Sequence, residues 1–242
     1  MENVNITLIL GALLPSLVLI GYICFKDKDH PEPTSQLLKA VFFGMLSADL
    51  SLLISIPLGW IGAYSSEPVT VLDHLRVAFF GAGLPEETAK LFMLWLALRK
   101  NPYFDENLDA IVYAVCVGMG FAFVENIGYL AQAGEYWVHT GIVRSIISVP
   151  GHFVFAVFMG YYYSYAHFSF TNKKLYRFLM LATPIMAHTA FDWILMVSDA
   201  VDYPEISMIL TAVFLVLFVF LQKMGQKDIV LHLANDKYRT ME

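Results

Sequence analysis

The chain has 242 residues, of which 58% are hydrophobic and 15% are charged, and its formal net charge is −6. A typical soluble domain carries about 25% charged residues, whereas the charges here cluster between long apolar runs. This pattern excludes a soluble globular domain and a disordered chain, and the lack of a basic stripe excludes a nucleic-acid-binding protein. We therefore predict an all-α polytopic membrane protein with one integral membrane domain over residues 1–242.

Seven apolar segments are long enough to cross a bilayer, for which a helix needs about 20 residues. The predicted spans are residues 5–25, 36–63, 72–98, 108–131, 141–167, 175–198 and 205–223, followed by a cytoplasmic tail at 224–242. The third span is the least regular because Gly81, Gly83 and Pro85 interrupt it. We expect a break between Gly83 and Pro85, with Pro85 in the first turn of the second half.

Lysine and arginine residues set the predicted orientation of the spans. Twelve of the 15 basic residues lie near the connections that follow spans one, three, five and seven, whereas 64–71, 132–140 and 199–204 contain none. This alternation places the N-terminus outside the cell and the C-terminus in the cytoplasm. Arg144 lies near an outer end, where snorkelling explains it, and His232 lies in a polar segment, which predicts solvation.

The third predicted span contains charged residues, which are unusual in a membrane-spanning segment. A charge at the bilayer centre costs at least about 2.5–3.5 kcal/mol on insertion scales. Lys90 follows Glu86 by four residues and Glu87 by three, so its ammonium group can reach either carboxylate. Adjacent side chains on a helix point about 100° apart. One glutamate can therefore pair with Lys90 while the other faces a cavity.

Three further spans carry ionisable residues at similar depths. Glu125 precedes Asn126 in the fourth span, His152 is in the fifth, and His188 and Asp192 are four residues apart in the sixth. The last spacing lets Asp192 orient the His188 imidazole. At about 1.5 Å per residue, the ionisable groups of these spans and Glu86 lie about 9–20 Å from the outer ends. The common depth predicts a water-accessible acid–base or metal site in the outer half of the membrane.

Four motifs on four predicted spans occur together and in one order. They are Glu86-Glu87-x-x-Lys90, Phe121-x-x-x-Glu125-Asn126, His152 and His188-x-x-x-Asp192. In this arrangement the chain resembles the PrsW family of intramembrane proteases over roughly residues 5–220. That family is distantly related to the CAAX prenyl protease superfamily. Leu91 stands where that superfamily has arginine, and Glu125 where its second motif has histidine, so both departures favour PrsW.

The resemblance implies a multi-pass protein of a bacterial cell membrane that cleaves a membrane-anchored protein near the outer face. Members of the family perform site-1 cleavage of anti-sigma factors, which starts the release of a transcription factor. The implied partners are therefore a membrane-anchored substrate, such as an anti-sigma factor, and the lipid bilayer, without nucleic acid.

Peptide hydrolysis needs a base for the attacking water, stabilising charge for the oxyanion and a proton for the leaving amine. We assign Glu86 as the general base, with Glu87 as the alternative. His188, oriented by Asp192, stabilises the oxyanion, and His152 shares the water or binds a metal.

The remaining candidate residues support this chemistry. Glu125 and Asn126 complete the site, and Lys90 tunes the glutamate pair electrostatically. A divalent metal such as zinc matches the types of ligand present, although the chain contains no H-E-x-x-H helix, and its presence stays open. The candidate metal ligands are His152, His188 and Glu86.

Two other functions also fit the intramembrane ionisable residues. A proton- or ion-coupled transporter uses such groups as relays, and a CAAX-type prenyl-protein protease shares part of the motif pattern. A transporter is disfavoured because the two halves show no repeated span pattern, and because the polar groups are confined to the outer half.

Overall fold

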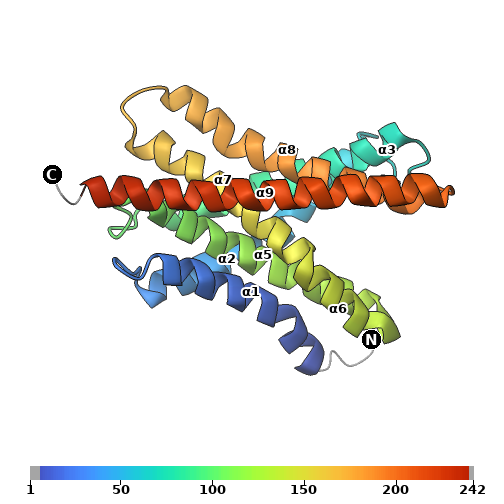
Figure 1. Cartoon of the computed structure of the whole chain (residues 1–242), viewed down its shortest axis with the longest axis horizontal. Helices are drawn as coiled ribbons and strands as arrows, with labels where there is room; N and C mark the ends of the chain where they lie inside the picture. The colour runs from blue at the N-terminus through green and yellow to red at the C-terminus, as the bar shows by residue number, and fades with distance from the viewer. Residues whose placement is uncertain (1–5, 240–242) are drawn as a thin grey trace.

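The computed structural model describes residues 6–239, and the regular elements in that range are all helical (Figure 1). In chain order they are α1 (Ile6–Lys26), α2 (Thr34–Trp60), α3 (Val71–Arg76), the π-helix η1 (Val77–Gly83), α4 (Leu84–Leu98), α5 (Asn107–Gln132), the 3₁₀-helix η2 (Gly134–Tyr136), α6 (Trp137–Ile146), α7 (Ser148–Phe168), α8 (Lys173–Ala200) and α9 (Pro204–Arg239). Residue 5 of the first predicted span and residues 240–242 of the predicted tail lie outside the described residues.

Six helical segments of the described chain are long and apolar enough to cross a membrane. They are α1, α2, α5, the segment from η2 to α7, α8 and α9. The polytopic α-helical class is therefore confirmed. The third predicted span is not one long helix, because α3, η1 and α4 form it in succession.

The third predicted span stays helical throughout but changes its winding. Gly81 and Gly83 lie in the π-helix, and Pro85 lies in the first turn of α4. Glycine is a weak helix former, and Pro85 has no N–H to donate to the preceding turn. The irregularity begins at Val77, earlier than the predicted break, and the two halves remain continuous.

The fifth predicted span consists of two helices, a division that we did not predict. Helix α6 ends at Ile146 and α7 begins at Ser148, with Ile147 between them at φ −112° and ψ −64°. Pro150 explains the junction, because its ring crowds the carbonyl group of residue 146 and it has no N–H to donate there. The short helix α6 therefore packs against α5 and α7 as a separate element.

Helices α5 and α7 form the centre of the bundle, with residues 108–122 and 151–160 buried without interruption. Glycines permit the tight crossing of α2 and α5. A Cβ atom on Gly44 would lie 2.1 Å from the carbonyl oxygen of Val117, and one on Gly120 would lie 2.2 Å from that of Val41. The two backbones are thus close enough to exclude any side chain at these positions.

The connections gather at two opposite ends of the molecule (Figure 1). The loops 27–33, 99–106 and 169–172 lie at one end, and the loops 61–70, 133–136 and 201–203 lie at the other. The basic residues near the connections are concentrated at the first of these ends. The chain therefore passes back and forth with the alternation that the sequence predicts.

The segment predicted as a tail is the continuation of α9, which runs to Arg239 and packs on the bundle (Figure 1). The Asp236 carboxylate accepts hydrogen bonds from the backbone N–H groups of Asn107 (3.0 Å) and Leu108 (2.9 Å), so it caps α5. His232 is buried and lies 2.7 Å from the Ser164 hydroxyl group, which corrects its predicted solvation.

Candidate active site

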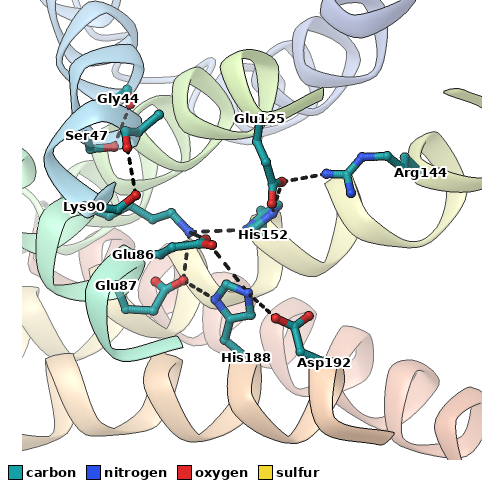
Figure 2. Close-up of polar contacts among 12 residues, drawn as sticks. Gly44, Ser47, Glu86, Glu87, Lys90, Glu125, Arg144, His152, His188 and Asp192 are labelled. Carbon is teal, nitrogen blue, oxygen red and sulfur yellow. Dashed lines mark hydrogen bonds and ion pairs between the residues drawn. The ribbon is translucent and has the colours of Figure 1, made fainter. Parts of the chain in front are cut away.

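Four helices direct polar side chains to one point inside the bundle (Figure 2). Helix α4 supplies Glu86, Glu87 and Lys90, α5 supplies Glu125, α7 supplies His152, and α8 supplies His188 and Asp192. Both glutamates of α4 lie in its first turn, directly after the π-helix. The predicted site residues therefore come together, as their common depth suggested.

Lys90 is at the centre of the group. Its ammonium nitrogen lies 2.8 Å from Glu87 Oε1 and 3.3 Å from Glu86 Oε2, so it contacts both carboxylates rather than one. It also lies 3.3 Å from His152 Nδ1 and 3.9 Å from the centre of the Phe121 ring. These contacts compensate the cost of holding a charged amine in the bundle.

His188 faces carboxylates through both ring nitrogens. Its Nδ1 lies 2.9 Å from Glu87 Oε1, and its Nε2 lies 3.3 Å from Asp192 Oδ2 and 3.9 Å from Glu86 Oε2. Ionised carboxylates only accept hydrogen bonds, so both nitrogens are placed to donate. The ring also stacks on Phe155 at 4.7 Å between centroids. The predicted pairing of His188 with Asp192 is thus present.

The tautomer of His152 follows from its partners. An ammonium group can only donate, so Nδ1 of His152 accepts from Lys90. The other nitrogen, Nε2, lies 2.8 Å from Glu125 Oε2 and donates its N–H there. Glu125 therefore orients His152 much as Asp192 orients His188.

Arg144 belongs to the site, although the sequence led us to expect it at the membrane surface. Its Nη2 lies 2.6 Å from Glu125 Oε2, and its Nε lies 2.6 Å from Asn126 Oδ1. Glu125 had no cationic partner in the sequence analysis. The sequence signal for such a partner was Arg144, the basic residue of the next predicted span.

A small cavity of about 110 Å³ opens among these groups. It is lined by Glu86, Glu125, Arg144, His152, His188 and Asp192 together with apolar side chains. A polar cavity of this size has room for water. The Glu86 side chain is 13% exposed and lines the cavity, whereas that of Glu87 is fully buried. The two adjacent glutamates therefore occupy different environments.

The donor set suits a divalent metal ion. One ligand atom from each of Glu86, Glu87, His152 and His188 lies within 4.8 Å of the others. Imidazole and carboxylate groups are typical ligands of catalytic zinc. Among the described residues, the buried Glu87 Oε2 has no hydrogen-bond partner, so it is free to accept a cation. These residues fit a metal, and Glu87 joins the three predicted candidate ligands.

The chain was then compared with known proteins. A family model described as "PrsW family intramembrane metalloprotease" matches residues 32–221. A protease PrsW of Clostridioides difficile (strain 630) is 34% identical over 196 residues, which are 80% of this chain and 81% of that protein. A protease PrsW of Geobacillus kaustophilus (strain HTA426) is 32% identical over 197 residues, which are 81% of this chain and 83% of that protein.

A third relative, a protease PrsW of Bacillus subtilis (strain 168), is 30% identical over 189 residues, which are 78% of this chain and 82% of that protein. No solved structure matches the chain. The family match includes α4, α5, α7 and α8, the four helices that supply the residues from Glu86 to Asp192. On this match the chain belongs to the PrsW family of intramembrane proteases and is a peptidase of the membrane.

Proposed function

We propose that this protein cleaves a peptide bond of a membrane-anchored protein near the outer face of the membrane. The observation that carries the proposal is the convergence of Glu86, His152 and His188 on a polar cavity of about 110 Å³ within the bundle. Because the chain belongs to the PrsW family, we propose neither of the two alternative functions, the transporter and the prenyl-protein protease.

Glu86 acts as the general base in this proposal. It lines the cavity, and its contacts with Lys90 (3.3 Å) and His188 (3.9 Å) are longer than those of Glu87 with the same residues (2.8 and 2.9 Å). Glu86 takes a proton from water, whose oxygen attacks the peptide carbonyl carbon. Glu87 holds Lys90 and His188 in place from its buried position.

The histidines stabilise the tetrahedral intermediate that the attack of water on the carbonyl carbon creates. His188 turns its Nε2–H, which lies 3.3 Å from Asp192 Oδ2, to the oxyanion. The His152 ring, held by Lys90 and Glu125, borders the cavity that holds the water. When the C–N bond breaks, the proton that Glu86 took from water passes to the leaving amine, so the base is regenerated. Glu125 supports His152 directly, and Asn126 holds the Arg144 side chain that contacts Glu125.

Glu86, Glu87, His152 and His188 would hold a divalent metal, as their donor chemistry indicates. When bound, such an ion supplies Lewis-acid polarisation of a carbonyl group and makes a coordinated water more acidic. We expect His152→Ala and His188→Ala each to lower the metal content of the purified protein, measured by elemental analysis. Wild-type cleavage by chelator-washed protein with far less than one metal per chain would contradict a metal role.

The proposed substrate side of the membrane depends on orientation. The basic residues near the connections are concentrated at one end of the bundle, which by the positive-inside rule is the cytoplasmic end. The site then lies in the outer half, where a site-1 protease acts on its substrate. An anti-sigma factor anchored by one span is the kind of substrate that we propose.

The test is reconstitution of the purified protein with a panel of tagged single-span bacterial membrane proteins, anti-sigma factors included. We expect the wild type to release an extracytoplasmic fragment from at least one of them, and Glu86→Gln to release far less. Release from no panel member by the wild type would refute the proposed function, and equal release by the two proteins would refute the role of Glu86 as the base.

A further inference from the structure

Arg144 holds two consecutive residues of α5 at once. Its side chain extends from the short helix α6 toward the bundle interior and is 11% exposed (Figure 2). One arm of the guanidinium group donates to Glu125 Oε2, and Nε donates to Asn126 Oδ1, both at 2.6 Å. The group also lies 3.9 Å from the centre of the Tyr129 ring. A snorkelling arginine would direct these donors to water or lipid headgroups instead.

The same Glu125 oxygen that Arg144 contacts also accepts the Nε2–H of His152. A line of contacts therefore runs from Arg144 through Glu125 to His152 and on to Lys90 in the glutamate cluster. Rotation of the Glu125 carboxylate would release the His152 ring. The planar guanidinium group of Arg144 holds Glu125 and Asn126 at the same time through donors in a fixed geometry, and this hinders the rotation. A single ammonium group lacks this fixed geometry.

The position of α6 adds to the argument. Helices α6 and α7 meet at Ile147, and His152 lies five residues beyond that junction. Arg144 fastens α6 to α5 next to the junction that Pro150 creates. The contact therefore holds the partner of His152 and also the helix that precedes α7.

We propose that Arg144 is a positioning residue, which holds Glu125 so that the carboxylate keeps His152 in its Nε2-protonated form and facing the cavity. The proposal rests on the proposed function for its kinetic consequence, but not for its effect on the histidine ring. Arg144 acts through Glu125 and does not itself carry out a chemical step.

The first test does not depend on a substrate. In protein with ¹⁵N-labelled histidine, we expect His152 to give the signals of the Nε2-protonated tautomer, assigned by their loss in His152→Ala. In Arg144→Ala only the 3.3 Å contact with Lys90 still favours the Nε2-protonated ring, so the signals should become those of a mixture of both tautomers. The matched control is Arg76→Ala, which removes an exposed arginine at the same end of the bundle. An unchanged His152 tautomer in folded Arg144→Ala would overturn the inference.

The second test uses the panel member that the wild type cleaves. Displacing a supporting group typically costs 10–100-fold, so we expect Arg144→Ala to lower kcat by about 10²-fold with KM within about threefold of the wild type. Added guanidinium should restore part of the kcat of Arg144→Ala and none of that of Glu86→Gln. Arg76→Ala should cleave like the wild type.

If Arg144→Ala does not fold, Arg144→Lys tests whether Arg144 positions Glu125, because lysine keeps the positive charge and lacks the planar set of guanidinium donors. We expect kcat to stay at least about tenfold below the wild type, and wild-type turnover by Arg144→Lys would overturn the inference. Failure of the wild type to cleave any panel member would instead refute the proposed function, and the tautomer experiment would still decide the role of Arg144.

Discussion

The charges of the site are arranged so that each cation serves more than one acceptor. Lys90 contacts two carboxylates and one imidazole, and Arg144 contacts one carboxylate and one amide. Removing either partner of a buried ion pair leaves an uncompensated charge and costs about 3–5 kcal/mol. The adjacent glutamates differ in this respect, because Glu87 holds Lys90 closely and Glu86 faces the cavity.

We therefore expect the two amide substitutions to behave differently. Glu86→Gln should lower turnover by about 10²–10⁴-fold, the usual contribution of a general base, while the melting temperature stays near that of the wild type. Glu87→Gln should lower the melting temperature clearly, because it takes the closest partner from the buried Lys90. Cleavage of the reconstituted substrate and thermal unfolding in detergent measure the two effects.

The control for this pair is Glu67→Gln, which changes an exposed glutamate in the connection before α3. It should alter neither measurement. If Glu86→Gln and Glu87→Gln both cleave at nearly the wild-type rate, the glutamates are not part of the chemistry. The site would then have to be rebuilt around His152 and His188.

Asp27, at the other end of the bundle, predicts a dependence of stability on pH. Burial and the neighbouring carboxylates of Glu32 and Glu106 raise its pKa from 3.8 to about 7, against a smaller opposing effect of His30. The folded protein then holds this proton to higher pH than the unfolded chain does. The stability that Asp27 contributes is complete below about pH 4 and is lost as the pH rises to about 7.

Asp27→Asn removes this loss, so the variant should melt at a higher temperature than the wild type at about pH 8 and at the same temperature at about pH 4. Thermal unfolding in detergent at the two pH values measures it. The control is Asp29→Asn, an exposed residue of the same loop. An equal shift at both pH values would show that Asp27 does not hold a proton in the folded state.

At the scale of elements, the glycines between α2 and α5 allow these two helices to pack with their backbones in contact. In Gly120→Ala the new Cβ would meet the Val41 carbonyl oxygen at 2.2 Å, so we expect a loss of about 1–3 kcal/mol or more from overpacking. Gly128→Ala on the same helix is the control, because among the described residues no atom beyond the adjoining residues and the nearby α5 backbone lies within 4 Å of the Cβ position.

Gly128→Ala should be neutral or slightly stabilising, since alanine is the better helix former by about 1 kcal/mol. Melting temperatures of the two purified variants test the difference. Equal stabilities would show that the crossing of α2 and α5 adjusts to the extra methyl group.

At the scale of the whole molecule, the orientation in the membrane is the prediction to test first. Reporter fusions after Asn101 and Lys173 should report the cytoplasm, because basic residues surround these connections. Fusions after Ser66, Gly134 and Asp202 should report the opposite side. A cytoplasmic signal from the 133–136 connection would reverse the orientation and with it the proposed site-1 role.

The sequence by itself determined the all-α class, most of the helical segments and the residues worth examining. Hydropathy identifies spans because a helix needs about 20 apolar residues to cross a bilayer. It also marks Glu86, His152 and His188 as ionisable residues within otherwise apolar spans. Pairs within one helix, such as Lys90 with Glu86, follow from the 3.6-residue repeat. The irregular third span was visible in its glycines and proline, although the start of the π-helix was not.

Only the tertiary structure decided which helices face one another. The contacts of Lys90 with His152 and of Arg144 with Glu125 join residues 62 and 19 positions apart, and no local pattern encodes such pairs. The same holds for the burial of His232 and Asp236 in α9, a segment whose polar composition suggested a solvated tail. Periodicity fixes the face on which a side chain lies, whereas packing fixes the rotation of each helix and therefore the partner which that face meets.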